Sequence, residues 1–294
     1  MTQTLAPPVK RPVLRYFGGK WMLAPWVISH LPSHRVYVEP FGGAASVLLR
    51  KPRSYAEIYN DLDGQVVQLF KVLRDPVAAD ELKNALRLTP FARQEFEAAY
   101  TPESNPVEQC RCLIIRALMG FGADGIRLDR TTGFRANSNR SGTTPAHDWV
   151  TYADGLDAVT QRLRGVVIEN RDALDVMRQH DGPQTLHYVD PPYLPATRSQ
   201  KTKSGDLYHG YVHDMATEDH LPLLDGLKDL EGRVVLSGYP SDLYDAALQG
   251  WRRIDRDALA DGARPRIECL WINAAAARAL EADQADATSQ GVLL

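Results

Sequence analysis

The hexapeptide Tyr188-Val189-Asp190-Pro191-Pro192-Tyr193 gathers residue types that could do chemistry at a single turn. β-prone residues lead up to Asp190, and the prolines that follow have no N–H to donate, so a buried strand must end there. The turn offers a carboxylate, backbone carbonyls without competing N–H groups, and the aromatic face of Tyr193. In an open α/β sheet, ligands bind at this carboxyl edge. A surface turn without chemistry is the alternative that the rest of the chain has to exclude.

The segment 36–47 predicts a second ligand-binding turn. A short β-rich strand ends in Glu39, passes a run of small residues and enters an apolar helix, the order of elements that seats nucleotide-like ligands. Ala45 stands where a dinucleotide fingerprint would carry a further glycine, and the Gly-Lys-Ser/Thr of a phosphate loop does not follow. A ligand without phosphates, such as S-adenosylmethionine, demands less exposed backbone at such a turn.

Two aspartates follow later strands and have two interpretations each. Asp61 comes after the predicted strand 55–59, close to the ~20 positions beyond Glu39 at which an acid meets ribose hydroxyls in such folds. Asp172 comes after the predicted strand 166–169, where an acid could accept from the adenine amine of a cofactor. Either residue could instead cap the helix that follows. Ribose contact is favoured for Asp61, and both roles of Asp172 stay open.

The paired glycines Gly18 and Gly19 precede Lys20 and a predicted helix at 26–30. Glycines let a backbone approach a ligand closely, and Lys20 could meet that ligand where the helix begins. A plain turn before a helix is the alternative.

A helical insert that contacts nucleic acid is predicted after residue 75. Helices are expected at 78–88, 91–100 and 107–120 with no strand between them, followed by a long polar stretch at 122–147. Loops of this length are usually functional or disordered, and these side chains suit phosphates and base edges. A solvated insertion is the alternative. The candidate contacts here are Arg116, Arg127, Arg130, Arg135, Asn137 and Arg140.

A second polar stretch, 194–212, follows the Asp190 turn and carries tyrosines among basic residues. This composition suits a loop that closes over a nucleic-acid substrate. Its candidate contacts are Arg198, Lys201 and Lys203.

Strands and helices alternate on both sides of the insert, which predicts an α/β fold. We expect a catalytic domain made of residues 12–75 and 160–275 and a recognition module at 76–159. Residues 1–11 and 276–294 are expected to be flexible tails.

Composition, cysteine content and net charge limit the classes of protein to which this chain can belong. Of the 294 residues, 44% are hydrophobic and 24% charged, as in ordinary soluble globular proteins. No apolar run approaches the ~20 residues that cross a bilayer, and the first residues carry no signal-like segment. Three cysteines provide neither a disulfide framework nor metal-ligand spacing, which predicts a reducing cytoplasm and no metal. A net charge of −3 excludes a uniformly basic nucleic-acid coat but allows local basic patches.

Several motifs in order resemble the Dam-like family of DNA adenine methyltransferases, which has many bacteriophage members. They are Gly-Gly-Lys at 18–20, Glu-Pro-Phe-Gly-Gly at 39–43, Asn-Asp at 60–61, the helical insert and Asp-Pro-Pro-Tyr at 190–193. The similarity runs from residue 14 to residue 273. It implies a Rossmann-like class I methyltransferase fold, a seven-stranded and mostly parallel sheet with a reversed edge strand, and S-adenosylmethionine as the methyl donor.

The resemblance also implies roles for residues. The catalytic motif falls on Asp190, Pro191, Pro192 and Tyr193. The family's cofactor-binding positions fall on Tyr16, Lys20, Glu39, Phe41, Gly43 and Asp61, to which Gly19, Asp172 and Asp190 are added as further candidates. The chain departs from the family at Tyr16-Phe17, where members usually carry Trp-Ala, and at Ala45, which replaces a glycine. The insert does not match the recognition module of the best-known members, so a GATC target is not implied.

The implied reaction is site-specific methylation of the 6-amino group of adenine in duplex DNA. This amine is a poor nucleophile because its lone pair is delocalised into the ring. Hydrogen bonds to the Asp190 carboxylate and the Pro191 carbonyl would free the lone pair, and positioning supplies most of the rate. The base must leave the duplex, and Tyr193 is expected to stack on it. Methylation of the cytosine 4-amino group, an RNA or protein substrate, and a catalytically silent DNA-binding relative stay open as alternatives.

Double-stranded DNA is the expected partner, bound with a steep salt dependence. A cognate restriction endonuclease is a further candidate partner. We expect a monomer or weak dimer, without a membrane segment, in the cytoplasm of a bacterium or a phage-infected cell.

Overall fold

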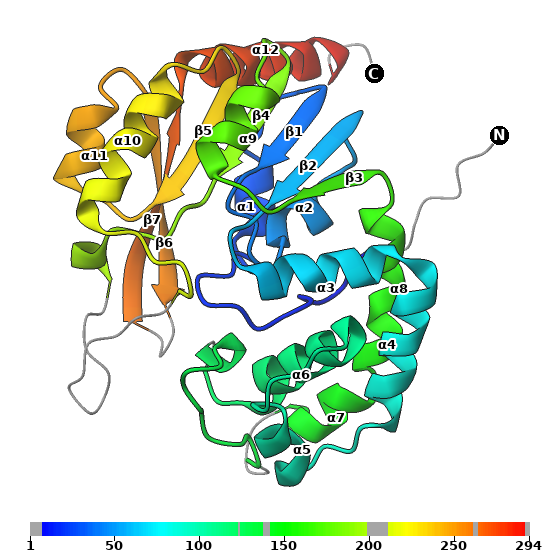
Figure 1. The fold of residues 1–294 in the computed structure, drawn as a ribbon. Coiled ribbons are helices and arrows are strands. Elements are labelled where there is room, and N and C mark those ends of the chain that lie inside the picture. The colour runs from blue at the N-terminus through cyan, green and yellow to red at the C-terminus, as the bar shows by residue number, and fades with distance from the viewer. Residues whose placement is uncertain (1–7, 123, 138–141, 199–210, 261–263, 292–294) are drawn as a thin grey trace.

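A mostly parallel sheet forms the centre of the computed structural model, which describes residues 8–122, 124–137, 142–198, 211–260 and 264–291 (Figure 1). Within these residues the sheet has seven strands in the order β3-β2-β1-β4-β5-β7-β6. The strands are β1 (Val36–Glu39), β2 (Ala56–Asn60), β3 (Val166–Glu169), β4 (Thr185–Val189), β5 (Arg233–Gly238), β6 (Arg252–Ala260) and β7 (Arg264–Ile272). The predicted α/β class with a mostly parallel sheet is confirmed.

The strand order brings two chemically important strand ends together. The chain lays down β1 to β3 towards one edge and β4 to β5 towards the other, and β1 pairs with β4 in parallel. Ligands bind outside the carboxyl ends of the strands at such a switch point. Glu39 ends β1 and Asp190 follows β4, so both lie there. β7 runs antiparallel to β5 and to β6, so the reversed strand lies one place inside the edge and β6 is outermost.

Helices cover both faces of the sheet (Figure 1). The sheet separates the apolar core into two clusters, one on each face. One cluster includes α1 (Ala24–Ile28), α2 (Ser46–Arg50), α3 (Gly64–Arg74) and α8 (Tyr152–Leu163). The other includes α9 (Ala173–Gln179), α10 (Thr217–Lys228) and α11 (Asp242–Ala247). Successive residues of a strand enter different clusters, as Tyr37 and Val38 do, because their side chains point to opposite faces.

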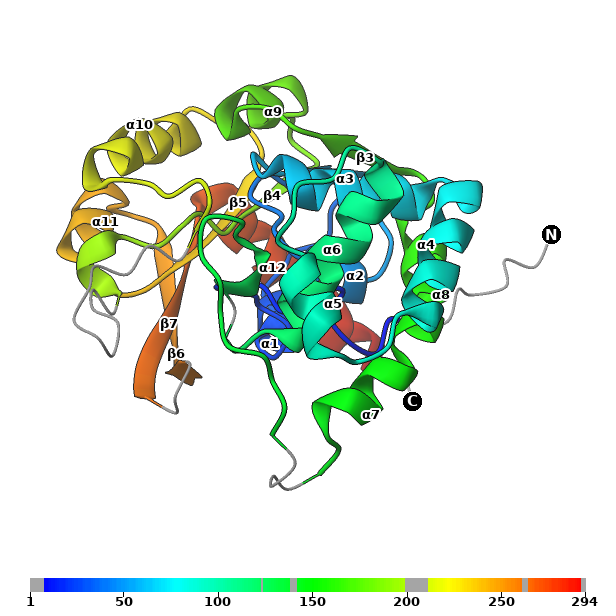
Figure 2. The ribbon, with the colours of Figure 1, turned by 60° about the horizontal axis from the view of Figure 1, so that its bottom comes forward.

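The insert is helical, as predicted (Figure 2). Its elements are α4 (Pro76–Leu88), α5 (Arg93–Ala98), α6 (Pro106–Met119), the 3₁₀ turn η1 (Asp124–Ile126) and α7 (Pro145–Val150). Asp75 and Asn105 cap α4 and α6, and a proline at the first helical position follows each cap. Ile114 and Ile115 of α6 belong to the same buried cluster as α3 and the sheet. The insert therefore shares its core with the sheet.

The prediction of a flexible tail after residue 275 is wrong as far as residue 291. Residues Ala274–Gly291 form α12, and its Ala276 and Leu280 are buried in the first cluster. Asn273 Oδ1 accepts the Ala276 N–H at 2.9 Å, so an alanine-rich segment with a good cap becomes a helix. Near the other end, Arg11 donates to the Asp148 carbonyl at 3.0 Å. Within the described parts of the chain, no helix is long and apolar enough to cross a membrane.

Candidate functional site

A cavity at the carboxyl ends of β1 and β4 collects most of the predicted ligand-binding residues. Those that line it are Tyr16, Gly19, Lys20, Glu39, Phe41, Gly43, Asp61, Asp190 and Pro192. Four residues that are far away in the sequence also line it, namely Tyr211, His213, Asp214 and Met215. The two strand ends singled out by sequence therefore face one cavity.

Asp61 holds the turn that follows β1. Its Oδ2 accepts the Gly43 N–H at 2.7 Å, and its Oδ1 accepts the Asp63 N–H at 2.8 Å. Asp63 caps α3 by accepting from Gln65 N–H, so the alternative that Asp61 caps this helix is wrong. Each carboxylate oxygen of Asp61 keeps a lone pair for a further donor. Burial raises the pKa of Asp61 to about 6.

The backbone of this turn passes close to Tyr16. Gly43 has a φ of +47°, and a Cβ on it would lie 2.8 Å from the Tyr16 ring. Its carbonyl accepts the Tyr59 hydroxyl at 2.7 Å. Ala45 has a φ of +53°, a left-handed conformation that costs a non-glycine residue ~1–2 kcal/mol. The turn therefore keeps its shape although alanine replaces the glycine expected at Ala45.

Glu39 fixes the start of α2. Its Oε2 accepts the Tyr37 hydroxyl at 2.7 Å and the Leu48 N–H at 2.9 Å. The N-cap residue of this helix is Ala45, which has no side-chain oxygen to accept an N–H of the first turn. Glu39 accepts one of these N–H groups in its place. Burial raises the pKa of Glu39 to about 8.

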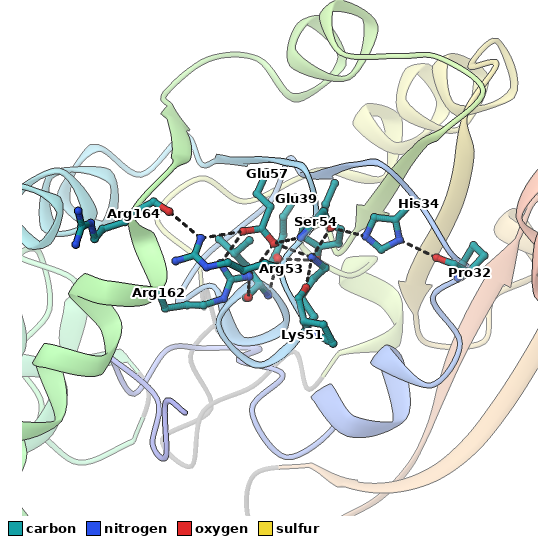
Figure 3. Close-up of polar contacts among 12 residues, drawn as sticks. Pro32, His34, Glu39, Lys51, Arg53, Ser54, Glu57, Arg162 and Arg164 are labelled. Carbon is teal, nitrogen blue, oxygen red and sulfur yellow. Dashed lines mark hydrogen bonds and ion pairs between the residues drawn. The ribbon is translucent and has the colours of Figure 1, made fainter. Parts of the chain in front are cut away.

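A buried ion network that the sequence analysis did not anticipate fixes the other end of α2 (Figure 3). Glu57 of β2 accepts from Lys51 at 2.7 Å and, with its two oxygens, from Arg162 of α8 at 2.6 and 2.8 Å. Arg162 also donates to the Leu48 carbonyl at 2.6 Å. The network therefore ties the helix that leads out of the insert to the helix that follows the cavity turn.

The Asp190 carboxylate is held through one oxygen. Ser237 Oγ donates to Oδ1 at 2.6 Å, and Lys20 Nζ lies 3.1 Å from the same atom. Lys20 also donates to the Gly18 carbonyl at 2.9 Å. Burial alone would lower the pKa of Lys20, but the Asp190 carboxylate and, beyond it, Glu268 raise it above its ordinary value. Lys20 is therefore a charged partner of Asp190.

Tyr193 is 5% exposed and is not among the residues that line the cavity. Its hydroxyl donates to Glu268 of β7 at 2.8 Å, and Lys20 Nζ lies 4.5 Å from its ring centre. The Tyr239 ring meets it edge-on at 4.7 Å. Stacking of a base on Tyr193 stays a prediction, and a base on the face that Lys20 covers would have to displace this lysine.

Asp172 is exposed and caps α9. Its Oδ1 accepts the N–H groups of Leu174 at 2.9 Å and Asp175 at 3.1 Å. Asp172 does not line the cavity, although its neighbour Ala173 does. The cap, one of the two interpretations left open, is confirmed, and contact with a cofactor stays a prediction.

Arg116 is a correction to the predicted DNA contacts. It is 2% exposed and donates to the Ala99 carbonyl at 2.6 Å and to Gln65 at 2.8 Å, because α6 turns this guanidinium into the protein. Arg130 and Asn137 are exposed, and Arg135 donates to the Leu118 carbonyl at 3.0 Å. The remaining candidates Arg140, Lys201 and Lys203 lie outside the described residues.

Arg127 and Arg198, also predicted to contact DNA, here support Tyr211. Arg198 pairs with Asp214 through bonds of 2.8 and 3.1 Å, and its guanidinium lies 5.5 Å from the Tyr211 ring. Arg127 donates to the Tyr211 carbonyl at 3.0 Å. Tyr211 lines the cavity beside Gly18, where a Cβ would collide with its hydroxyl. Composition predicted a DNA-contacting loop at 194–212, and the place of Tyr211 in the cavity wall was not predicted.

Comparison with known proteins relates this geometry to a class of enzymes. The family model for D12 class N6 adenine-specific DNA methyltransferases matches residues 16–260. The DNA adenine methylases of Escherichia coli strain K12 and of Escherichia coli O157:H7 are each 24% identical over 242 residues, covering 79% of this chain and 82% of theirs. The family match includes the cavity turn, the insert and the Asp190 turn.

Proposed function

The chain belongs to the D12 class of N6 adenine-specific DNA methyltransferases, and we propose that the cavity at the ends of β1 and β4 is its active site. Family membership makes DNA the substrate and N6 of adenine the methyl acceptor. The observation that carries the site assignment is Asp190, which lines the cavity with Oδ1 engaged. None of the described residues hydrogen-bonds its Oδ2, so that oxygen is available to an amine.

The residues around the cavity fit S-adenosylmethionine. Tyr16, Phe41 and Tyr211 offer aromatic faces to a cation, and Glu39 and Asp61 offer oxygens to hydroxyl and amine donors. When bound, this donor would supply a methyl group whose bond to a positively charged sulfur breaks with the electron pair left on sulfur, while N6 takes the methyl and releases one proton to solvent. Among the described residues, no group of metal-ligating side chains competes for this assignment.

Asp190 and Pro191 prepare the amine in this proposal. Asp190 Oδ2 and the Pro191 carbonyl each accept one N–H of the adenine amine, which turns its lone pair out of conjugation. Pro191 and Pro192 are buried, although only Pro192 lines the cavity, and their rings restrict the backbone of the turn that carries both acceptors. Preorganised acceptors of this kind supply most of the rate.

An adenine within a duplex cannot reach the cavity, so we propose that the base is flipped out. Exposed groups of the insert, Arg130 and Asn137 among them, are proposed to contact the DNA backbone. A restriction endonuclease partner, a monomeric or weakly dimeric state and a cytoplasmic location stay predictions.

The test uses purified protein, unmethylated duplex DNA and methyl-labelled S-adenosylmethionine, followed by digestion of the DNA to nucleosides. We expect the label in 6-methyladenine. Label in 4-methylcytosine would keep the site and overturn the substrate. Cofactor binding without label in any DNA would contradict the proposed activity.

A further inference from the structure

Pairing of β4 with β5 brings Ser237 beside Asp190. The two strands are parallel with Val189 opposite Leu236, so the next residue of each chain continues the same register. Ser237 is 2% exposed, and its Oγ lies 2.6 Å from Asp190 Oδ1. The neighbouring strand therefore supplies a buried hydroxyl to the catalytic turn.

The chemistry of the two groups fixes the direction of this hydrogen bond. An ionised carboxylate only accepts, so Ser237 donates its single hydroxyl proton to Asp190. The lone pairs of Ser237 Oγ then face the hydroxyl of Tyr188 at 3.4 Å. Lys20 occupies the same Oδ1 at 3.1 Å. Both donors thus converge on one oxygen, and within the described chain Oδ2 receives none.

Tyr193 is held similarly by the next strand along. Glu268 of β7 is 7% exposed and accepts the Tyr193 hydroxyl at 2.8 Å. β7 lies beyond β5 in the sheet, on the side of β4 away from β1. The cofactor turn after β1 and the strands that carry Ser237 and Glu268 therefore lie on opposite sides of β4.

We propose that Ser237 and Glu268 are positioning residues for methyl transfer, an inference that rests on the catalytic role proposed for Asp190. Ser237 stops the Asp190 carboxylate from rotating about its Cβ–Cγ bond, so that Oδ2 is directed at the amine. Glu268 fixes the ring of Tyr193 through its hydroxyl. Neither side chain touches the base, and each acts through a residue of the catalytic turn.

The first test compares three variants of Ser237. Ser237→Ala removes the donor, Ser237→Cys keeps the volume but donates weakly, and Ser237→Thr keeps the hydroxyl. We expect the alanine and cysteine variants to lose roughly 10–100-fold in kcat, with Kd for S-adenosylmethionine and for DNA unchanged within about twofold. Threonine is expected to restore most of the rate. If its extra methyl lowers Tm, the comparison of cysteine with wild type decides.

The second test concerns Glu268. Glu268→Gln keeps an oxygen that accepts the Tyr193 hydroxyl and should keep most of kcat. Glu268→Leu removes this acceptor and should lose most of kcat. Tyr193→Phe removes the donor of the same bond, so Tyr193→Phe combined with Glu268→Leu should lose no more than the worse single variant. Additive losses would overturn the role of Glu268.

The outcome for Asp190 separates this inference from the assignment of the site. If Asp190→Ala retains turnover, the proposed site is wrong. If Asp190→Ala abolishes transfer while Ser237→Ala and Ser237→Cys keep the wild-type kcat, the site stands and the positioning role of Ser237 is wrong.

Discussion

Glu39 is a buried carboxyl group that holds its proton more tightly in the folded protein than in the unfolded chain. Burial raises its pKa to about 8, whereas an unfolded glutamate titrates near ~4.3. Because the folded pKa is the higher one, the contribution of Glu39 to the free energy of unfolding is full below the unfolded pKa. It is lost as the pH rises through about 8.

We therefore expect Glu39→Gln, which cannot ionise, to flatten the fall in the free energy of unfolding between pH ~4 and ~8. Asp61 shifts in the same direction with a pKa of about 6, so part of the fall should remain. Urea unfolding of both proteins across this range measures the difference. Parallel pH profiles would show that Glu39 does not titrate in this way.

Gly43 makes the close approach of the cavity turn to Tyr16 possible. A Cβ at this position would lie 2.8 Å from the Tyr16 ring, on a residue whose φ is +47°. Because the strain of ~1–2 kcal/mol falls on a cavity wall, we expect Gly43→Ala to weaken S-adenosylmethionine binding roughly tenfold. Gly64→Ala is the matched control, since a Cβ there meets nothing within 4 Å. Calorimetric titration should find the control unchanged, and equal affinities for both variants would argue against the assigned turn.

The main site residues could be predicted because residue types that end a β-strand follow them closely in the sequence. Prolines follow Asp190 and glycines follow Glu39, so both acids had to lie at strand ends. Their partners could not be predicted in the same way. Ser237 and Glu268 meet the catalytic turn only through the register of β5 and the reversal of β7. Arg116 was wrongly predicted because counting arginines does not show which face of a helix each one occupies.

At the scale of elements, α2 is a helix of five residues held at both ends by buried acidic and basic side chains. Glu39 binds its first turn, and Arg162 binds the Leu48 carbonyl while pairing with Glu57. A helix this short has little stability of its own, so these contacts maintain it. Strand β6 was not predicted from the sequence. Its side chains from Arg252 to Asp257 are largely exposed at the sheet edge and show no apolar alternation.

We expect Glu57→Gln to lower the free energy of unfolding by about 3–5 kcal/mol, because it leaves Lys51 and Arg162 buried without a counter-charge. Arg87→Gln is the control, since its pair with Asp154 is 45% and 65% exposed and should contribute less than about 1 kcal/mol. Urea unfolding compares the two variants. Similar losses would contradict the structural role of the network.

At the scale of the whole molecule, the insert and the sheet share one apolar cluster, and α6 of the insert lies beside α3 (Figure 2). Arg162 of α8 connects the end of the insert to the cavity side of the sheet, and Arg127 of the insert binds the Tyr211 carbonyl in the cavity wall. Of the basic residues of the insert, Arg127 therefore supports the cavity wall, Arg116 is buried and Arg130 faces solvent. Sequence composition predicted the insert but could not make this division.

Arg130 is exposed and is proposed to contact a phosphate. We expect Arg130→Gln to weaken binding to duplexes of any sequence and to reduce the slope of log Kd against log salt by about one. Arg178→Gln, at an exposed arginine of α9 outside the insert, should change neither quantity. Fluorescence anisotropy at several salt concentrations measures both, and an unchanged slope for Arg130→Gln would remove this residue from the DNA interface.

The most direct test of the assigned active site is labelled methyl transfer to duplex DNA by Asp190→Ala, with S-adenosylmethionine binding and Tm measured on the same preparation. The assignment of Asp190 predicts no 6-methyladenine above background from a variant that still folds and still binds S-adenosylmethionine, although loss of the buried counter-charge of Lys20 should lower Tm. Turnover near the wild-type rate in this variant would contradict it.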